Sequence, residues 1–115
     1  MIHASIKMEL KSEKRTEAIQ VLCSIAERTR SKAGCLGCAI FQSIEHGDEI
    51  LFEQFWRNDD DLLSHLRSED YQKLLLIIEM SSKKPEVQFN TITNMTGMET
   101  IERARRQKRS KASIT

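Results

Sequence analysis

Polar and apolar residues alternate along the start of the chain. From Ile2 to Leu10 every second residue is apolar, and the residues between them are polar. This period of two predicts a β-strand with one buried face. After Ser12 the apolar residues recur at intervals of three and four as far as Thr29. That spacing predicts an amphipathic helix, with Ser12 as its N-cap and Gly34 as the residue that ends it.

Two more strands and a second helix are predicted next. Residues 35–44 and 49–57 are strand-like runs joined by a turn at residues 46–48, which is typical of an antiparallel hairpin. Asn58 is a suitable N-cap for the helix that follows, since three aspartates come after it and suit the positive end of a helix dipole. Ser68 is expected to cap a continuation of this helix, whose apolar face would be Tyr71, Leu74, Leu75 and Ile78.

A fourth strand over residues 86–94 and a short helix from Met98 to about Gln107 complete the pattern. The order β-α-β-β-α-β predicts an α+β, ferredoxin-like fold, in which a four-stranded antiparallel sheet carries both helices on one face. We expect one domain over residues 1–97, followed by a short helix and basic tail over residues 98–115. The uncovered face of the sheet would expose apolar side chains, so we expect a homodimer that pairs through it; the predicted patch is Phe41, Leu51, Phe55 and Phe89.

Charge and composition change this picture only at the C-terminus. The 115-residue chain has a formal net charge of +1, but residues 101–115 alone carry +5. This tail lacks interleaved aromatic residues, so we favour a solvated, disordered tail over a nucleic-acid-binding segment. No apolar run approaches the roughly 18 residues that span a membrane. The chain shows no signal-peptide pattern and has an odd number of cysteines, which together favour the cytoplasm.

Several residues, in their order and spacing, resemble the antibiotic biosynthesis monooxygenase family. They are the run Gly34-Cys35-Leu36-Gly37, the hairpin, Trp56 with His65 nine positions later, and then Ser68 and Tyr71. The likeness covers residues 2–95 and implies a dimeric α+β barrel. Members of the family include cofactor-free monooxygenases of phenolic and quinol-type substrates, haem-degrading enzymes, and an isomerase that acts on a signalling sugar.

The chain departs from the family's pattern in two respects. The family often has a glutamate two residues before the aromatic residue, where this chain has Gln54, a neutral amide. The haem-degrading members need a histidine and an asparagine at positions that hold Leu75 and Ile6 here. The resemblance therefore does not imply haem chemistry, and we expect no cofactor.

Trp56 and His65 are the residues we single out as a candidate site. They would border an apolar pocket between the second helix and the sheet, where a small aromatic molecule could bind. His65 could take a proton from a phenolic hydroxyl or stabilise a developing oxyanion, Trp56 could stack on the ring, and Gln54 and Tyr71 could orient it. The alternative, to which the residues alone give equal weight, is that Trp56 is a core residue and His65 a partly exposed helix residue.

The pair Cys35 and Cys38 has the spacing of a metal or redox motif. Zinc needs four converging ligands, and the chain has no second pair of this kind. Residues three apart on a regular strand point to opposite faces, so we interpret both cysteines as structural and expect no metal. The sequence thus favours a cofactor-independent monooxygenase of a quinol or phenol. The alternatives are a non-catalytic or isomerase-like small-molecule binder on the same scaffold, and a dimer that binds nucleic acid through its tail.

Overall fold

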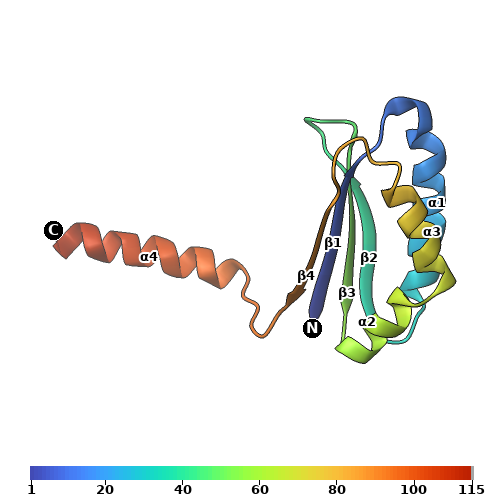
Figure 1. Ribbon diagram of the computed structural model, residues 1–115. Coiled ribbons are helices and arrows are strands. Elements are labelled where there is room, and N and C mark those ends of the chain that lie inside the picture. The colour runs from blue at the N-terminus through green and yellow to red at the C-terminus, as the bar shows by residue number, and fades with distance from the viewer. Residues whose placement is uncertain (115) are drawn as a thin grey trace.

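The computed structural model describes the backbone of residues 1–114 and the side chains of residues 1–107. Four antiparallel strands form one sheet in the order β2-β3-β1-β4. The elements follow the predicted order, and the second helical stretch is divided near Ser68, where a break was predicted (Figure 1). They are β1 (Ile2–Glu9), α1 (Ser12–Arg30), β2 (Cys35–Gln42), β3 (Glu49–Trp56), α2 (Asp59–Leu66), α3 (Glu69–Ile78), β4 (Glu86–Thr91) and α4 (Met98–Ile114). The ferredoxin-like prediction is confirmed.

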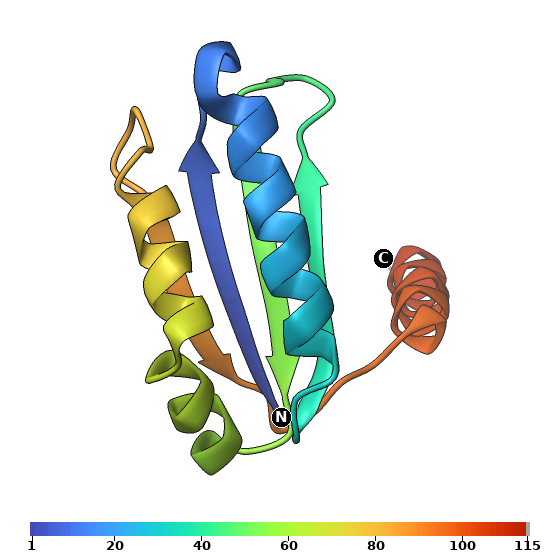
Figure 2. The same ribbon diagram turned by 90° about the vertical axis from the view of Figure 1, so that its right-hand side faces the viewer.

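One face of the sheet is covered by α1, α2 and α3, as Figure 2 shows. The alternation along β1 accounts for this arrangement, because Ile2, Ala4, Ile6 and Met8 are all buried while the residues between them are not. On the neighbouring strand β3 the buried residues are Ile50, Phe52, Gln54 and Trp56. The core lies between this face and the helices.

The opposite face of the sheet is uncovered within this chain. Phe41 and Leu51 are paired across β2 and β3 on this face, and Phe55 packs there against His3 with ring centroids 4.7 Å apart. The prediction for Phe89 was wrong. Phe89 is paired with Ala4, a residue that faces the helices, and residues directly opposite each other in a sheet share a face. Phe89 therefore lies on the helix side, where it is 47% exposed at the sheet edge.

Helix ends agree with the predictions for α2 and α3 but not for α1. Asn58 accepts the backbone N–H of Asp61 at 2.9 Å, and Ser68 accepts that of Tyr71 at 3.2 Å, so both predicted N-caps are confirmed. In α1 the N-cap is Lys11, and Ser12 is already helical. On α3 the buried residues are Tyr71, Leu74 and Ile77. Tyr71 and Leu74 were predicted for this face, whereas Leu75 was predicted there but is 47% exposed.

Gly34 does not end α1, which stops at Arg30 with Ser31 as its C-cap. Gly34 instead lies directly before β2 and has a φ of +80°, a conformation that residues with a Cβ atom rarely adopt. A Cβ atom at this position would lie 2.1 Å from Asp61 Oδ2. The glycine therefore allows the loop before β2 to pass close to the start of α2.

A bulge in β2 overturns the prediction that the two cysteines point to opposite faces of the sheet. The register shifts between Cys35 and Gly37, so Cys35 is paired with Trp56 and Cys38 with Gln54. Both partners face the helices, and both cysteines therefore lie on the same face of the sheet rather than on opposite faces. Burial raises the pKa of both thiols, that of Cys38 to about 12, which favours their protonated forms at neutral pH.

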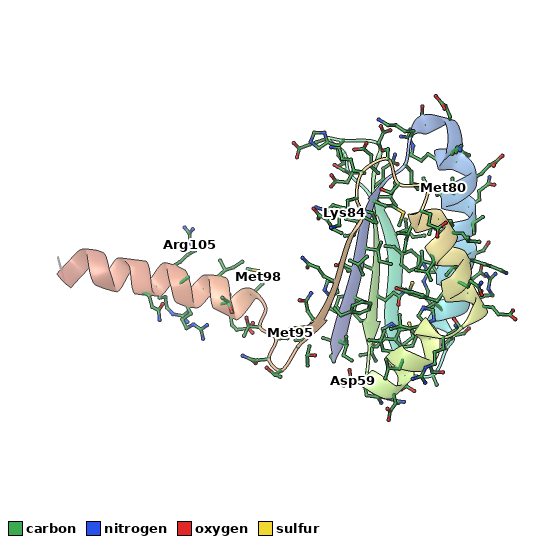
Figure 3. All side chains as sticks on the ribbon, in the orientation of Figure 1. Asp59, Met80, Lys84, Met95, Met98 and Arg105 are labelled. Atoms are coloured by element: carbon green, nitrogen blue, oxygen red, sulfur yellow. The ribbon has the colours of Figure 1, made fainter. Side chains whose placement is uncertain are left out.

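The last helix, α4, is longer than predicted and reaches Ile114. It leaves β4 on the uncovered side of the sheet and extends away from the rest of the molecule (Figure 3). Met95 lies in the segment that leads to the helix, and Met98 and Arg105 lie on the helix itself. Met98 and Ile101 are more than half exposed. Over the residues that the structure describes, no helix is both long and apolar enough to cross a membrane.

Candidate functional site

Gln54 and Trp56 lie two residues apart on β3 and therefore face the same way. Trp56 Nε1–H donates to Gln54 Oε1 at 2.8 Å, and both side chains are buried. Trp56 also packs against Ile2 and Leu62, so the indole has no exposed surface. The family-typical carboxylate position thus holds an amide whose oxygen already has a partner.

His65 lies on α2 and packs directly against Trp56. The two ring centroids are 4.8 Å apart with an interplanar angle of 30°. Tyr71, on α3, meets the imidazole edge-on at 5.5 Å and 81°. His65 is only 2% exposed, which contradicts the alternative of a partly exposed helix residue. The structure therefore brings the four predicted residues Gln54, Trp56, His65 and Tyr71 together, although their role in binding stays a prediction.

Sequence reasoning missed Lys32, which lies in the loop between α1 and β2. Its Nζ is 3.0 Å from His65 Nδ1 and 3.8 Å from Asp70 Oδ2. Arg28 approaches the same carboxylate at 2.9 Å. Lys32 is 33 residues from His65, and nothing in the local pattern of the chain links the two positions.

The surroundings of His65 change its acid–base behaviour. Burial, and to a lesser degree the nearby Lys32 ammonium, lower its pKa to about 4, while Asp70 acts in the opposite direction. The imidazole is therefore neutral at physiological pH. Its Nε2 is buried and has no hydrogen-bond partner among the described residues.

Two hollows flank this aromatic cluster. A groove of about 250 Å³ is bordered by Lys32, Ala33, Trp56, Ser64 and His65, and it opens to solvent at the end of the sheet. On the other side, a crevice lies between the sheet and α3, and it is too narrow to hold a water molecule; its walls are Ala4, Ile6, Phe52, Gln54, Tyr71 and Phe89. An engineered cavity of about 150 Å³ holds benzene, so the groove has room for a single substituted ring.

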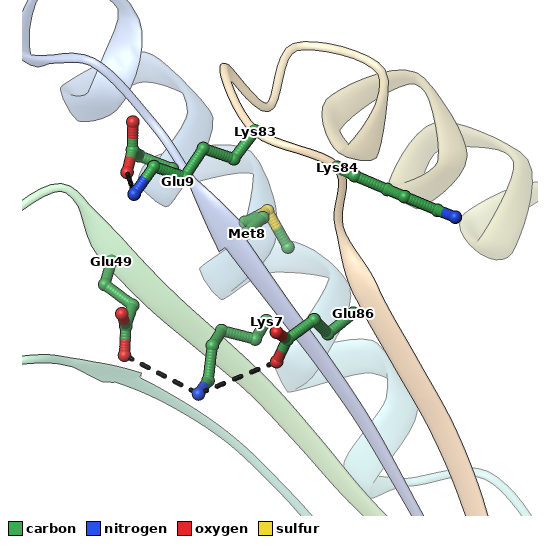
Figure 4. Close-up of a pocket in the computed structure, with 7 residues that line it drawn as sticks. All are labelled: Lys7, Met8, Glu9, Glu49, Lys83, Lys84 and Glu86. Carbon is green, nitrogen blue, oxygen red and sulfur yellow. Dashed lines mark ion pairs between the residues drawn. The ribbon is translucent and has the colours of Figure 1, made fainter.

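Another hollow, separate from these two, lies at the other end of the sheet, between β1, β3 and the loop before β4 (Figure 4). Its charged groups neutralise one another. Lys7 Nζ lies 3.9 Å from Glu49 and 3.7 Å from Glu86, and Lys83 Nζ lies 3.3 Å from Glu9. Because these charges are paired and exposed, they do not define a binding site for a particular ligand.

No cluster of three or more histidine, cysteine, aspartate or glutamate side chains that could hold a metal ion is found within the described part of the chain. The candidate site is the aromatic cluster with its groove.

Comparison with solved structures shows the fold. The chain superposes on a structure of an antibiotic biosynthesis monooxygenase with a TM-score of 0.73 and 19% identity, covering 82% of this chain and 100% of that one. A structure described as a putative antibiotic biosynthesis monooxygenase from Deinococcus radiodurans gives a TM-score of 0.77 at 16% sequence identity, covering 84% of this chain and 97% of that one. A Bacteroides thetaiotaomicron protein of unknown function, called a possible oxidoreductase, gives 0.72 at 16% identity, covering 79% and 96%.

At these levels of identity the structural neighbours establish the fold alone. No curated protein matches the chain. The profile of the family described as antibiotic biosynthesis monooxygenase, however, matches residues 1–75, which span the sheet strands β1 to β3 and the residues of the aromatic cluster. The chain therefore belongs to the antibiotic biosynthesis monooxygenase family.

Proposed function

We propose that this protein is a cofactor-independent monooxygenase that oxidises a small phenol or quinol. The observation that carries the proposal is the buried, neutral imidazole of His65, which packs on Trp56 beside a groove of about 250 Å³. Its Nε2 has no hydrogen-bond partner among the side chains and backbone that the structure describes. A buried polar atom without a partner is costly and is therefore uncommon away from functional sites. Membership of the monooxygenase family supports the reaction class.

The proposed chemistry uses the electrons of the substrate itself. Release of the hydroxyl proton to solvent leaves an electron-rich anion, which transfers one electron to O₂. The substrate radical and superoxide then combine to form a carbon–oxygen bond. The resulting peroxide takes up a proton, and loss of water from this hydroperoxide leaves a carbonyl. One oxygen atom is thus kept in the product and the other is released as water. The protein contributes orientation of the ring and exclusion of bulk water.

His65 is the proposed catalytic group, in contact with the hydroxyl oxygen of the substrate. The sequence favoured a base, with stabilisation of an oxyanion as the alternative. A histidine with a pKa of about 4 is a weak proton acceptor for a phenol, so the environment of His65 favours the second role. Gln54 and Tyr71 are proposed to orient the substrate ring, and Trp56 is proposed to stack on it. Stacking would require α2 to move, because the Trp56 indole has no exposed surface.

The test is oxygen uptake with a panel of single-ring quinols and phenols. We expect His65→Gln to lower the rate by about 10²-fold or more, the usual contribution of a positioned proton-transfer or hydrogen-bonding group. His46→Gln, in the exposed turn before β3, is the matched control and should leave the rate unchanged. Equal rates for the wild type and His65→Gln would remove His65 from the mechanism.

A non-catalytic small-molecule binder is the second candidate, and one observation favours it. The position of the usual family glutamate holds Gln54, whose oxygen is already bonded to Trp56. A binder predicts that ligand raises the melting temperature by mass action without any oxygen consumption. The same quinol panel therefore separates the two candidates, if melting and oxygen uptake are measured side by side.

We also propose that two copies of the chain pair through the uncovered face of the sheet. The apolar residues Phe41, Leu51 and Phe55 support this, because they lie together on β2 and β3 with no covering element from the described chain. The direction of α4 also supports it, since this helix extends from the same side of the sheet and carries the exposed Met98 and Ile101 (Figure 1).

A further inference from the structure

Lys32 contacts the candidate catalytic imidazole, and both residues border the groove. Its Nζ is 3.0 Å from His65 Nδ1. The ammonium is held there by Asp70, whose Oδ2 is 3.8 Å away and whose other oxygen accepts a hydrogen bond from Arg28 Nε at 3.0 Å. Lys32 is itself only partly exposed, so this contact is not that of a freely solvated side chain.

The chemistry of the two groups determines where the imidazole proton lies. An ammonium group has three donors and no acceptor, so the ring nitrogen that faces it must accept the hydrogen bond. A neutral imidazole carries one proton on one of its two nitrogens. With Nδ1 accepting from Lys32, the proton must lie on Nε2, and His65 then presents a donor on the side away from Lys32.

This donor has no partner in the structure. Nε2 is buried and finds no acceptor among the described residues. The aromatic groups around the ring are the face of Trp56 and the edge of Tyr71. A buried N–H without an acceptor is energetically unfavourable, and binding of a ligand that carries an oxygen acceptor would relieve this cost.

We propose that Lys32 is a positioning residue that fixes His65 in the tautomer protonated on Nε2, so that His65 donates a hydrogen bond to a substrate oxygen anion instead of removing its proton. The identity of that oxygen rests on the proposed function, whereas the tautomer does not. The depressed pKa of His65 agrees with this arrangement, because Lys32 contributes to lowering it and an imidazolium would have to direct a donor at a cation.

The tautomer can be measured directly in the ligand-free protein. In a long-range ¹H–¹⁵N spectrum of ¹⁵N-histidine-labelled protein, a protonated and an unprotonated ring nitrogen give well-separated signals. His65→Gln identifies which signals belong to this residue. For the wild type at neutral pH we expect an unprotonated Nδ1 and a protonated Nε2 in a single tautomer.

Three variants test the role of Lys32. Lys32→Met removes the donor, so we expect a mixture of tautomers and a pKa of His65 above that of the wild type. Lys32→Arg keeps a cationic donor and should retain the wild-type tautomer. Lys73→Met is the matched control, because Lys73 is an exposed lysine that acts on Asp70 but shows no hydrogen bond to the ring. An amide spectrum of each variant establishes that it is folded.

A proton on Nδ1 in the wild type, or an unchanged tautomer in folded Lys32→Met, would overturn the inference. Oxygen uptake tests the function separately. If quinols are oxidised, we expect Lys32→Met to lower kcat at least tenfold with a smaller change in KM, and Lys32→Arg to recover most of it. If the predicted tautomer is found but no quinol or phenol is oxidised, the proposed function fails and the assignment of the proton stands.

Discussion

His65 is the residue at which burial, charge and packing meet. It is enclosed by Trp56 and Tyr71, and its Nδ1 lies beside the Lys32 ammonium, which Asp70 holds in place. Burial first, and then Lys32, lower its pKa from 6.5 to about 4, while Asp70 opposes the shift. Folding therefore favours the neutral form of this side chain, and the stability of the protein is linked to pH through it.

The sign of this linkage follows from the two pKa values. Above pH 6.5, His65 is neutral in both the folded and the unfolded chain and has no effect on the difference between them. As the pH falls from 6.5 towards 4, the unfolded chain binds a proton that the folded chain does not, so stability is lost. At about 1.4 kcal/mol for each pKa unit, lowering the pH from 7.5 to 5 should cost on the order of 2 kcal/mol.

Urea unfolding at pH 7.5 and pH 5 measures this loss. In His65→Phe, which keeps an aromatic ring but cannot titrate, most of the pH-dependent loss should disappear. His46→Gln should show the full wild-type loss, because His46 lies in an exposed turn. If His65→Phe loses as much stability as the wild type over this range, other groups are responsible for the pH dependence.

At the scale of single elements, the start of α2 can be tested most directly. Asn58 accepts the Asp61 N–H at 2.9 Å, and the helix it caps carries His65. Asn58→Ala should destabilise the protein by about 1 kcal/mol, whereas Asn58→Asp should be close to neutral because aspartate caps equally well. The measurement is again urea unfolding. A loss of similar size in both variants would mean that the cap hydrogen bond is not what Asn58 contributes.

The elements also show what the sequence could and could not predict. Alternation in β1 and the capping residues Asn58 and Ser68 are local signals, and they predicted those elements correctly. The bulge at Cys35 was missed because a register shift depends on the neighbouring strand and not on the residues of β2 alone. Phe89 was placed on the wrong face for the same reason, since its side is set by its pairing with Ala4.

The candidate site was predictable to a similar extent. Trp56 and His65 were found because the strand end and the next helix are adjacent in the chain, so local spacing brings them together. Lys32 was not found, because its contact with His65 joins segments that only the packing of α1 against the sheet brings close. Whether an imidazole is exposed or buried also depends on such long-range packing.

At the scale of the whole molecule, the open face of the sheet is the surface that a second copy of the chain would cover. This face carries the apolar residues Phe41, Leu51 and Phe55 on β2 and β3, where Phe41 is 51% exposed. It is charged where Lys7 on β1 lies between Glu49, the first residue of β3, and Glu86, the first residue of β4. An interface between two copies related by a two-fold axis would use the same patch on both. A single substitution in the patch would then be present twice in the dimer.

The proposed dimer is tested by analytical ultracentrifugation over a range of concentrations. We expect the wild type to sediment as a dimer and Phe41→Glu to shift strongly towards the monomer, since two carboxylates would be buried without partners. Each 1.4 kcal/mol of lost interaction energy weakens the dimer by about tenfold. Leu76→Glu is the matched control, because Leu76 is 59% exposed on α3, on the helix side of the sheet. A wild-type monomer at every concentration, or equal dimerisation of the two variants, would show that the open face is not the dimer interface.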